Sequence, residues 1–450
     1  MRISGTLLII MVAYLLLPGS SVKAQKKWTL EDCIEYALDN NIRIKRENVS
    51  AKQLENDYNQ SFFEFFPEVN GSAKHSFRSG KTFSYDVLDY VNQEYHYGQV
   101  QLNSNLTLFN GLENQNRRKK RKFDLKSQLA GIEEARYDVK MNITTYYLNV
   151  LSKHEQKQIK KEQLDVTTDQ IDKTKQQVQV GNKAKGDLLE IKAQAARERV
   201  ELTRAKNELK MAYVDLTQLM NLDSMKNFSV YFPEKDTITG EETVKSADAI
   251  YNESVDDFPS INYAEFQLKS SEKNLEIMKG RRYPDLNLGF GVFTYYNEIR
   301  KNQFDIAYDE QLDENLSMVA EIRLSIPIFS NRQIHNQIQN AKLSVEDSRL
   351  QLKERKQNLY KDIQRARNEA ISAYDDYKAN IEAVNSSREA FQYAKEKYDV
   401  GLVDIVEYKV AKKDLTEARL NATQAKYNYF FRLMLLEFYM GKDLTFETNG

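Results

Sequence analysis

The stretch Tyr398-Asp399-Val400-Gly401-Leu402-Val403-Asp404-Ile405-Val406-Glu407 separates two long runs of helical periodicity. A second stretch, Gln179-Val180-Gly181-Asn182-Lys183-Ala184-Lys185-Gly186-Asp187-Leu188, lies in the same setting 220 positions earlier, as measured between the two Val-Gly glycines. The same offset relates Leu108-Phe109 to Ile328-Phe329, and an offset of 217 relates Pro67 to Pro284. The spacing predicts a tandem duplication with a small length change inside it.

The composition limits the function. The 450 residues include 65 basic and 66 acidic side chains, so no net charge recruits nucleic acid. Many charges with few glycines and prolines favour long solvated helices over a large globular core. The single cysteine, Cys33, excludes an intrachain disulfide.

The N-terminus has the pattern of a secretory signal peptide. Basic Arg2 precedes an apolar run from Thr6 to Leu17, and Val22-Lys23-Ala24 is a small-x-small cleavage site. A membrane anchor is the alternative, but the run is shorter than the roughly 20 residues of a spanning helix. We therefore predict a signal peptide at 1–24, a first repeat at 25–221, a linker at 222–246, and a second repeat with a C-terminal tail at 247–450.

Helical periodicity covers most of the chain. Thr29 with Asp32 predicts a capping box at the first helix, and Pro259 interrupts a later one. The expected helices are 29–59, 112–178, 187–219, 246–282, 334–400 and 404–440. Helices of this length are typical of coiled-coil packing.

Strands are predicted where apolar and polar residues alternate, at 69–78, 100–108, 286–292 and 318–326. The segments 79–97 and 297–314 are expected to be polar loops. A strand of about ten residues can cross a bilayer, where strands must close into a barrel. Four strands cannot close alone; two chains would supply eight strands and three would supply twelve, with room for water.

The two faces of these strands differ. Even-numbered residues of 100–108 and 318–326 are expected to face lipid. The opposite face is expected to line a wet interior, with Lys74, Asn103, Asn105, Asp285, Glu321 and Arg323. A soluble sheet with one solvated face is the alternative.

Nothing in the sequence indicates catalysis. His75, His96, His154 and His335 are scattered and form no paired-histidine zinc motif. We therefore expect no enzyme activity, no metal and no cofactor. The basic run 117–122 would suggest nucleic-acid binding, but a secreted chain favours a solvated helix start near lipid phosphates.

The ordered motifs resemble the TolC family of outer-membrane efflux proteins. They are the opening Thr29-Leu30-(x)3-Ile34-(x)2-Ala37-Leu38-x-Asn40-Asn41, the two Pro-strand starts, Leu108-Phe109-Asn110-Gly111, Ile326-Pro327-Ile328-Phe329, and the paired Val-Gly turns. The resemblance implies a mainly α protomer with membrane β, built by tandem duplication. It also implies a homotrimer with a twelve-stranded β-barrel in the outer-membrane lipid and a long α-helical barrel in the periplasm.

The function implied is the passive exit duct of a tripartite efflux or type I secretion system. An inner-membrane transporter and a periplasmic adaptor (membrane fusion) protein would be its partners. A structural or adhesive coiled-coil envelope protein without transport activity is the alternative, although such a rod has no use for the four strands. The sequence does not indicate whether drugs, metals or polypeptides are the cargo.

The resemblance also implies a gate at the two turns. Tyr398 matches the family's gate tyrosine, Asp187 its aspartate partner, and Glu407 an acidic ring position; Gly181, Gly401 and Asp404 complete the turns. Val403 and Val410 replace the family's arginine and a second acidic residue, so Lys183 and Lys185 become candidates for the cation. We expect the Tyr398 hydroxyl to donate a hydrogen bond to Asp187 or a nearby carbonyl. Packing and helix capping are the alternative roles.

Overall fold

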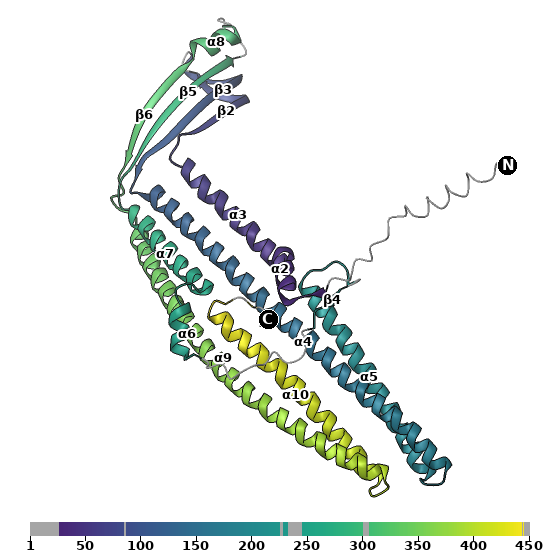
Figure 1. Ribbon diagram of the computed structural model, residues 1–450. Helices are drawn as coiled ribbons and strands as arrows, with labels where there is room; N and C mark the ends of the chain where they lie inside the picture. Colours follow the sequence, from purple (N-terminus) through teal and green to yellow (C-terminus); the bar gives the residue numbers. More distant parts are fainter. Residues whose placement is uncertain are drawn as a thin grey trace, which may run out of the picture. The chain divides into compact units, whose positions relative to one another are not determined.

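The computed structural model describes residues 27–84, 87–225, 228–232, 245–299, 306–442 and 444. The predicted signal peptide lies outside these residues. The chain divides into two compact units (Figure 1). We call them the hairpin unit (up to Ile42, Tyr137–Ser246 and from Gln364) and the sheet unit (Arg43–Arg136 and Ala247–Ile363).

The helices repeat the duplication seen in the sequence. Helices α4 (Glu113–Gln179) and α9 (Gln333–Asp399) each have 67 residues, and each contributes to both units. Helices α5 (Lys185–Leu219) and α10 (Ile405–Tyr439) each have 35 residues and belong to the hairpin unit. The predicted helical hairpins α4/α5 and α9/α10 are confirmed. None of the helices that the structure describes is long and apolar enough to cross a membrane.

The first predicted helix is two helices, α2 (Leu30–Asn40) and α3 (Ile42–Phe63), so the prediction of one helix at 29–59 was wrong. Asn41 adopts an extended backbone with ψ 124° and interrupts the helical hydrogen bonds. The capping box is confirmed, because Thr29 accepts from the Asp32 amide and Asp32 accepts from the Thr29 amide, both at 3.1 Å.

A small parallel sheet joins the start of the predicted first repeat to the predicted linker. Strand β1 (Lys27–Trp28) pairs with β4 (Ser229–Val230). The buried Tyr147 of α4 donates to the carbonyl oxygen of Tyr231 at 2.8 Å. This hydrogen bond attaches the β1/β4 pair to the long helix within the hairpin unit.

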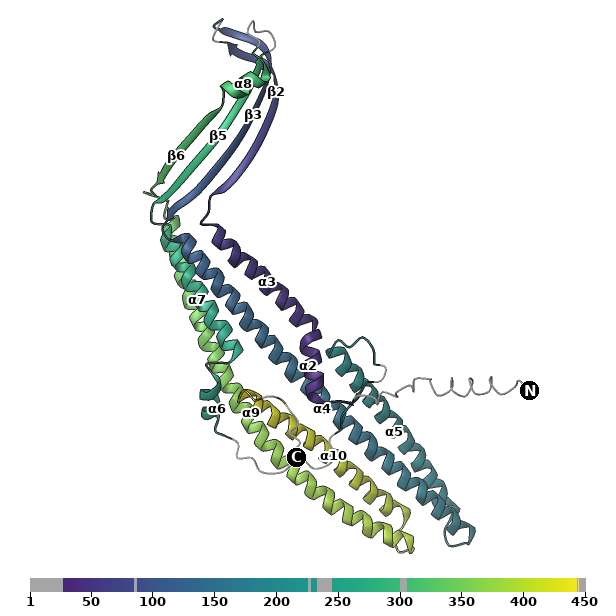
Figure 2. The same cartoon turned by 45° about the horizontal axis from the view of Figure 1, so that its top comes forward.

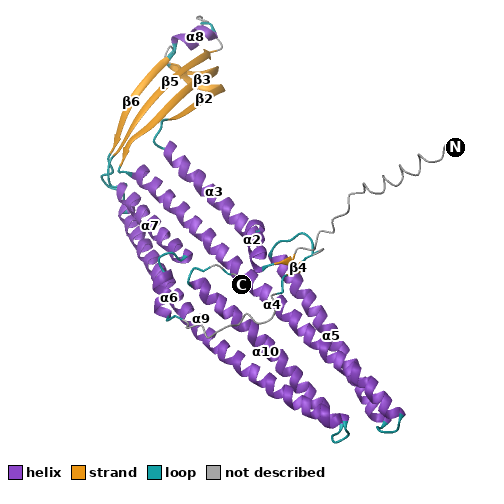
Figure 3. Ribbon diagram, viewed as in Figure 1, coloured by secondary structure: helices purple, strands orange, loops and turns teal. Residues whose placement is uncertain are grey.

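The sheet unit contains four antiparallel strands in the order β2-β3-β5-β6 (Figures 2 and 3). These are β2 (Glu68–Ser84), β3 (Asp89–Asn110), β5 (Asp285–Ile299) and β6 (Ser317–Ser325). Helices α6 (Ala247–Ser254), α7 (Pro259–Gly280) and α8 (Tyr308–Glu314) complete the unit with α3 and parts of α4 and α9. The interruption predicted at Pro259 is confirmed: α6 ends before it and Pro259 is the first residue of α7, a position that suits proline.

The prediction of a polar loop at 79–97 is wrong, because β2 and β3 extend into this segment and pair with each other as a long hairpin. Ser79 donates to Glu94 at 3.4 Å, and the Phe83 and Tyr90 rings contact each other edge to face at 5.4 Å. Ladder hydrogen bonds join backbone groups, so polar side chains do not end a strand. The loop predicted at 297–314 contains the helix α8, and its residues 300–305 lie outside the described part.

The strand register places the predicted polar and apolar residues on opposite faces. Leu106 pairs with Leu288, and Leu288 with Ile322, so these three lie on one face. A bulge between Thr107 and Phe109 then pairs Phe109 with Leu286. The bulge thus adds Phe109 to the apolar face opposite Leu286, which strict alternation from Leu106 did not predict.

The strands enter the long helices through matched left-handed turns. Gly111 and Leu112 have φ angles of 62° and 63°, and Asn331 and Arg332, 220 positions later, have 47° and 62°. A Cβ atom on Gly111 would lie 2.2 Å from the carbonyl oxygen of Gly280, so glycine is required here for space as well as for its φ.

Candidate functional site

The glycine turns of the hairpin unit have the same backbone geometry. Gly181 and Gly401 have φ angles of 80° and 79°. Behind them, the Asn182 amide donates to the Gln177 carbonyl at 2.8 Å and the Leu402 amide donates to the Lys397 carbonyl at 2.9 Å. This is the Schellman ending of a helix, which needs a left-handed residue and so favours glycine. The two predicted turns are confirmed as equivalent structures.

Tyr398 and Lys183 join the two turns. The Lys183 ammonium donates to the Tyr398 carbonyl oxygen at 3.1 Å and lies 3.1 Å from the centroid of the Tyr398 ring. The ring is buried and stacks on Tyr408 at 5.1 Å, in a cluster with Ile191 and Ile405. Of the two candidate cations, Lys183 is therefore the one that contacts Tyr398, whereas Lys185 is exposed.

The predicted hydrogen bond from Tyr398 to Asp187 is absent. The buried Tyr398 hydroxyl has no partner among the residues that the structure describes, and neither has the Tyr408 hydroxyl. The reason is that the ring is directed into the apolar cluster, where Ile191 and Ile405 surround it. Instead, the negative charge of the half-buried Asp187 favours the protonated form of Lys183.

Burial changes the protonation equilibria at this site. It lowers the pKa of Lys183, against the opposing charges of Asp187 and Asp399. Burial also raises the pKa of the Tyr398 hydroxyl, and the neighbouring Thr174 side chain opposes that change. Both residues thus lie in an environment that disfavours charge.

Asp404 and Glu407 have different roles in the second turn. Asp404 caps α10, because one of its carboxylate oxygens accepts from the amides of Val406 and Glu407, both at 3.0 Å. The Glu407 side chain is exposed. Val403, at the position of the family's arginine, packs against the apolar cluster around Tyr398.

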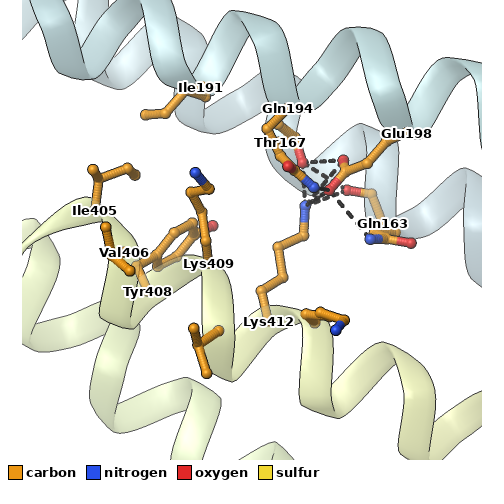
Figure 4. Close-up of a pocket in the computed structure, with 12 residues that line it drawn as sticks. Gln163, Thr167, Ile191, Gln194, Glu198, Ile405, Val406, Tyr408, Lys409 and Lys412 are labelled. Carbon is orange, nitrogen blue, oxygen red and sulfur yellow. Dashed lines mark hydrogen bonds and ion pairs between the residues drawn. The ribbon is translucent and has the colours of Figure 1, made fainter.

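A buried polar cluster that was not predicted from the sequence lies farther along the hairpins. The Lys412 ammonium on α10 lies 3.0 Å from the Glu198 carboxylate on α5, and both side chains are buried (Figure 4). Thr167 and Gln163 of α4 complete the cluster. The sequence pattern could have indicated that Lys412 is buried, since Lys412 follows Ile405 and Tyr408 at the helical spacing of a buried stripe.

In the sheet unit, the predicted wet-face residues do share one face. The register pairs Asn105 with Gly289 and Gly289 with Glu321, and it pairs Asn103 with Gly291. The remaining members follow the same parity and include Lys74, Asp285 and Arg323. Arg323 donates to Glu321 at 2.7 Å on this face.

The basic run at the start of α4 is largely ion-paired. Arg117 bonds Glu64 at 3.1 Å, Lys120 bonds Asp124 at 2.8 Å, and Arg121 bonds Asp57 at 2.5 Å. Arg118 instead lies over the Phe62 ring, 5.1 Å from its centroid. Arg118 and Arg121 therefore hold this part of α4 against α3. No group of three acidic, histidine or cysteine side chains among the described residues could hold a metal ion.

Comparison with known proteins identifies the family. A model of the outer membrane efflux protein family matches residues 33–222 and 250–442. The chain belongs to this family. The predicted TolC-like protomer, mainly α-helical with a four-stranded antiparallel sheet, is thereby confirmed in its family and fold class.

Relatives of the family share the fold at low sequence identity. Outer membrane protein TolC of Vibrio cholerae is 20% identical over 258 residues, and the chain spans 57% of the length of that relative. The solved structure of CusC aligns with a TM-score of 0.77 at 17% identity over 92% of both chains. VceC of Vibrio cholerae aligns with a TM-score of 0.76 at 15% identity, over 92% of this chain and 96% of the other. The CmeC outer membrane channel of Campylobacter jejuni aligns with a TM-score of 0.77 at 16% identity, over 93% and 87%.

Proposed function

We propose that the chain is one protomer of a homotrimeric duct that carries efflux or type I secretion cargo passively across the periplasm and the outer membrane. The sheet carries this proposal. Its strands β2 and β6 are open edges, and one of its faces exposes Met318, Ile322 and Leu324 at 59–70%. The unpaired backbone groups of the two edge strands form hydrogen bonds when neighbouring copies supply strands, and the apolar face is removed from water when lipid covers it.

The charged residues on the opposite face of the sheet favour an assembly of three chains over an assembly of two. Eight strands enclose an interior that side chains fill, whereas twelve leave room for water. Lys74, Glu321 and Arg323 on the inner face are charged, and they need water in a membrane interior. The glycine turns with Tyr398, Asp187 and Glu407 are proposed as the periplasmic constriction, where the exposed Glu407 would favour cations.

The exposed tips of the turns support docking of a periplasmic adaptor and an inner-membrane transporter. Val180, Val400 and Leu402 are 71–76% exposed. Apolar side chains at the end of a helical hairpin have no packing role within the protomer. They are the part of the hairpin unit that another protein would cover.

The test is assembly and conduction of the purified mature protein in detergent. Chemical crosslinking should give a largest species of three times the protomer mass, and the protein should form discrete channels in planar bilayers. A monomer or dimer as the largest species would contradict the trimer. A trimer that conducts in neither its wild-type form nor any variant of the turns would contradict the duct.

A further inference from the structure

The buried ion pair of the hairpin unit has every polar atom satisfied across three helices. The Lys412 ammonium on α10 donates to the Gln163 carbonyl oxygen at 2.7 Å, to the Thr167 hydroxyl and to the Glu198 carboxylate. Glu198 also accepts from Gln163 at 3.2 Å, from Gln194 at 3.0 Å and from Thr167. The three donors of the lysine and both oxygens of the carboxylate are thus used within the protein.

Burial distinguishes this pair from the others between the same hairpins. The Lys412 and Glu198 side chains are 7% and 3% exposed. The neighbouring pair Lys409–Glu190, at 3.3 Å, has exposures of 28% and 51%. Exposed pairs contribute little to stability, whereas loss of one partner from a buried pair leaves an uncompensated charge in the interior.

Packing beside the pair is incomplete. A cavity of about 220 Å³ is lined by Ile191, Ile405 and Tyr408 together with the ion pair (Figure 4). The buried Gln163 side-chain oxygen and Tyr408 hydroxyl in its wall have no hydrogen-bond partner among the described residues. Ile191 of α5 packs with Ile405 and Tyr408 of α10 on one side of this cavity, and the polar cluster lies on the other, so both attach α10 to the α4/α5 hairpin.

We propose that Lys412 and Glu198 form a latch that helps to hold α10 against the α4/α5 hairpin in the closed duct, and that opening requires their separation. This inference rests on the proposed function, because closure has meaning only for a conduit. In this proposal the positive charge near the gate comes from Lys412 of α10, because Val403 stands at the position of the family's arginine. Lys183 then joins the two glycine turns, and Lys412 holds α10 farther from the turns.

A double-mutant cycle tests the latch. Glu198→Gln and Lys412→Met each leave one buried charge unpaired, and each should raise the open probability in planar bilayers at least about tenfold. The double variant removes the latch without leaving a buried charge unpaired, so its open probability should lie between the wild-type value and that of the single variants. Glu190→Gln with Lys409→Met is the matched control on the same two helices and should have no effect.

Spin labels at the exposed positions Ala193 of α5 and Asp414 of α10 give a readout that does not depend on conduction. Their separation should lengthen in each single variant and lengthen less in the double variant. Single variants that match the control pair in both measurements would overturn the latch. Where a single variant fails to assemble, Thr167→Val should still produce a smaller lengthening, and an unchanged distance would count against the proposal. Lengthening without conductance in any form of the protein would support the latch and contradict the duct.

Discussion

The Nζ atom of Lys183 lies 3.1 Å from the centroid of the Tyr398 ring and donates to the Tyr398 carbonyl oxygen at the same distance. One residue of the first turn thus contacts both the ring and the backbone of the second. The contact uses the lysine as a cation on an aromatic face. It replaces the hydroxyl-to-carboxylate bond that the sequence suggested.

Lys183→Met should weaken the closed tip. The ammonium is partly desolvated, so its contact with the ring is worth about 1–2 kcal/mol, and its loss should raise the open probability in planar bilayers. Lys185→Met is the matched control, because Lys185 is exposed two positions away. Equal behaviour of the two variants would show that Lys183 contributes only as a surface charge.

Tyr398→Phe should leave the thermal midpoint unchanged or slightly higher. The hydroxyl is buried and, among the described residues, has only the Thr174 side chain beside it and no well-formed hydrogen bond, so its removal should cost little and relieve some desolvation. Tyr398→Ala removes the buried ring and should destabilise the hairpin unit by about 3–5 kcal/mol. Calorimetry of both variants checks the prediction, and a clear destabilisation by the phenylalanine would reveal a hydrogen bond that this structure lacks.

Arginine should be tolerated on only one face of the sheet. Leu102 pairs with Val292 on the apolar face, and Asn103 pairs with Gly291 on the polar face. Leu102→Arg should impair assembly at a cost of about 2–4 kcal/mol near the membrane midplane, whereas Asn103→Arg should assemble normally. Heat-resistant oligomers on detergent gels measure the difference, and equal loss in both variants would refute the assignment of faces.

Gly280→Ala should destabilise the sheet unit. An added Cβ atom would lie 2.6 Å from the Gly111 carbonyl oxygen, which is a backbone atom and cannot turn aside. Gly186→Ala is the control, since nothing lies within 4 Å of its Cβ position in helix α5. The control should gain about 0.5–1 kcal/mol from helix propensity, and a rise in both thermal midpoints would exclude the close contact.

Acidification should destabilise the hairpin unit through His154. This side chain stacks on Phe232 at 4.0 Å, and burial lowers its pKa, with Lys157 adding to the effect and Glu155 opposing it. As the pH falls from the ordinary value of 6.5 towards the lowered pKa, the unfolded chain binds more protons, so the unfolding free energy decreases.

His154→Gln should therefore reduce the loss of thermal midpoint between about pH 7.5 and pH 5. His335→Gln is the control, because His335 is exposed. If both variants lose as much as the wild type, carboxylates rather than His154 account for the acid sensitivity.

Much of the architecture follows from the sequence because it depends on local periodicity. The spacing of apolar residues predicted the helical hairpins, and the glycine in each Val-Gly pair predicted their turns, since a left-handed residue is needed there. The 220-residue offset predicted helices of matched length, and α4 and α9 do have equal lengths. Alternation predicted four strands and the polar face that carries Asn103 and Asn105.

Other features were decided only by contacts between distant segments. The hairpin of β2 and β3 extends through a polar stretch because backbone groups pair across it, and the bulge before Phe109 places Phe109 opposite Leu286 on the apolar face. By itself, the sequence determined the repeat, its helices and turns, and the alternating strands, because these reflect steric and hydrophobic preferences of neighbouring residues. Only the tertiary structure decided that Lys183 meets Tyr398 and Lys412 meets Glu198, because each pair joins residues more than 200 positions apart, whose approach depends on how whole helices pack.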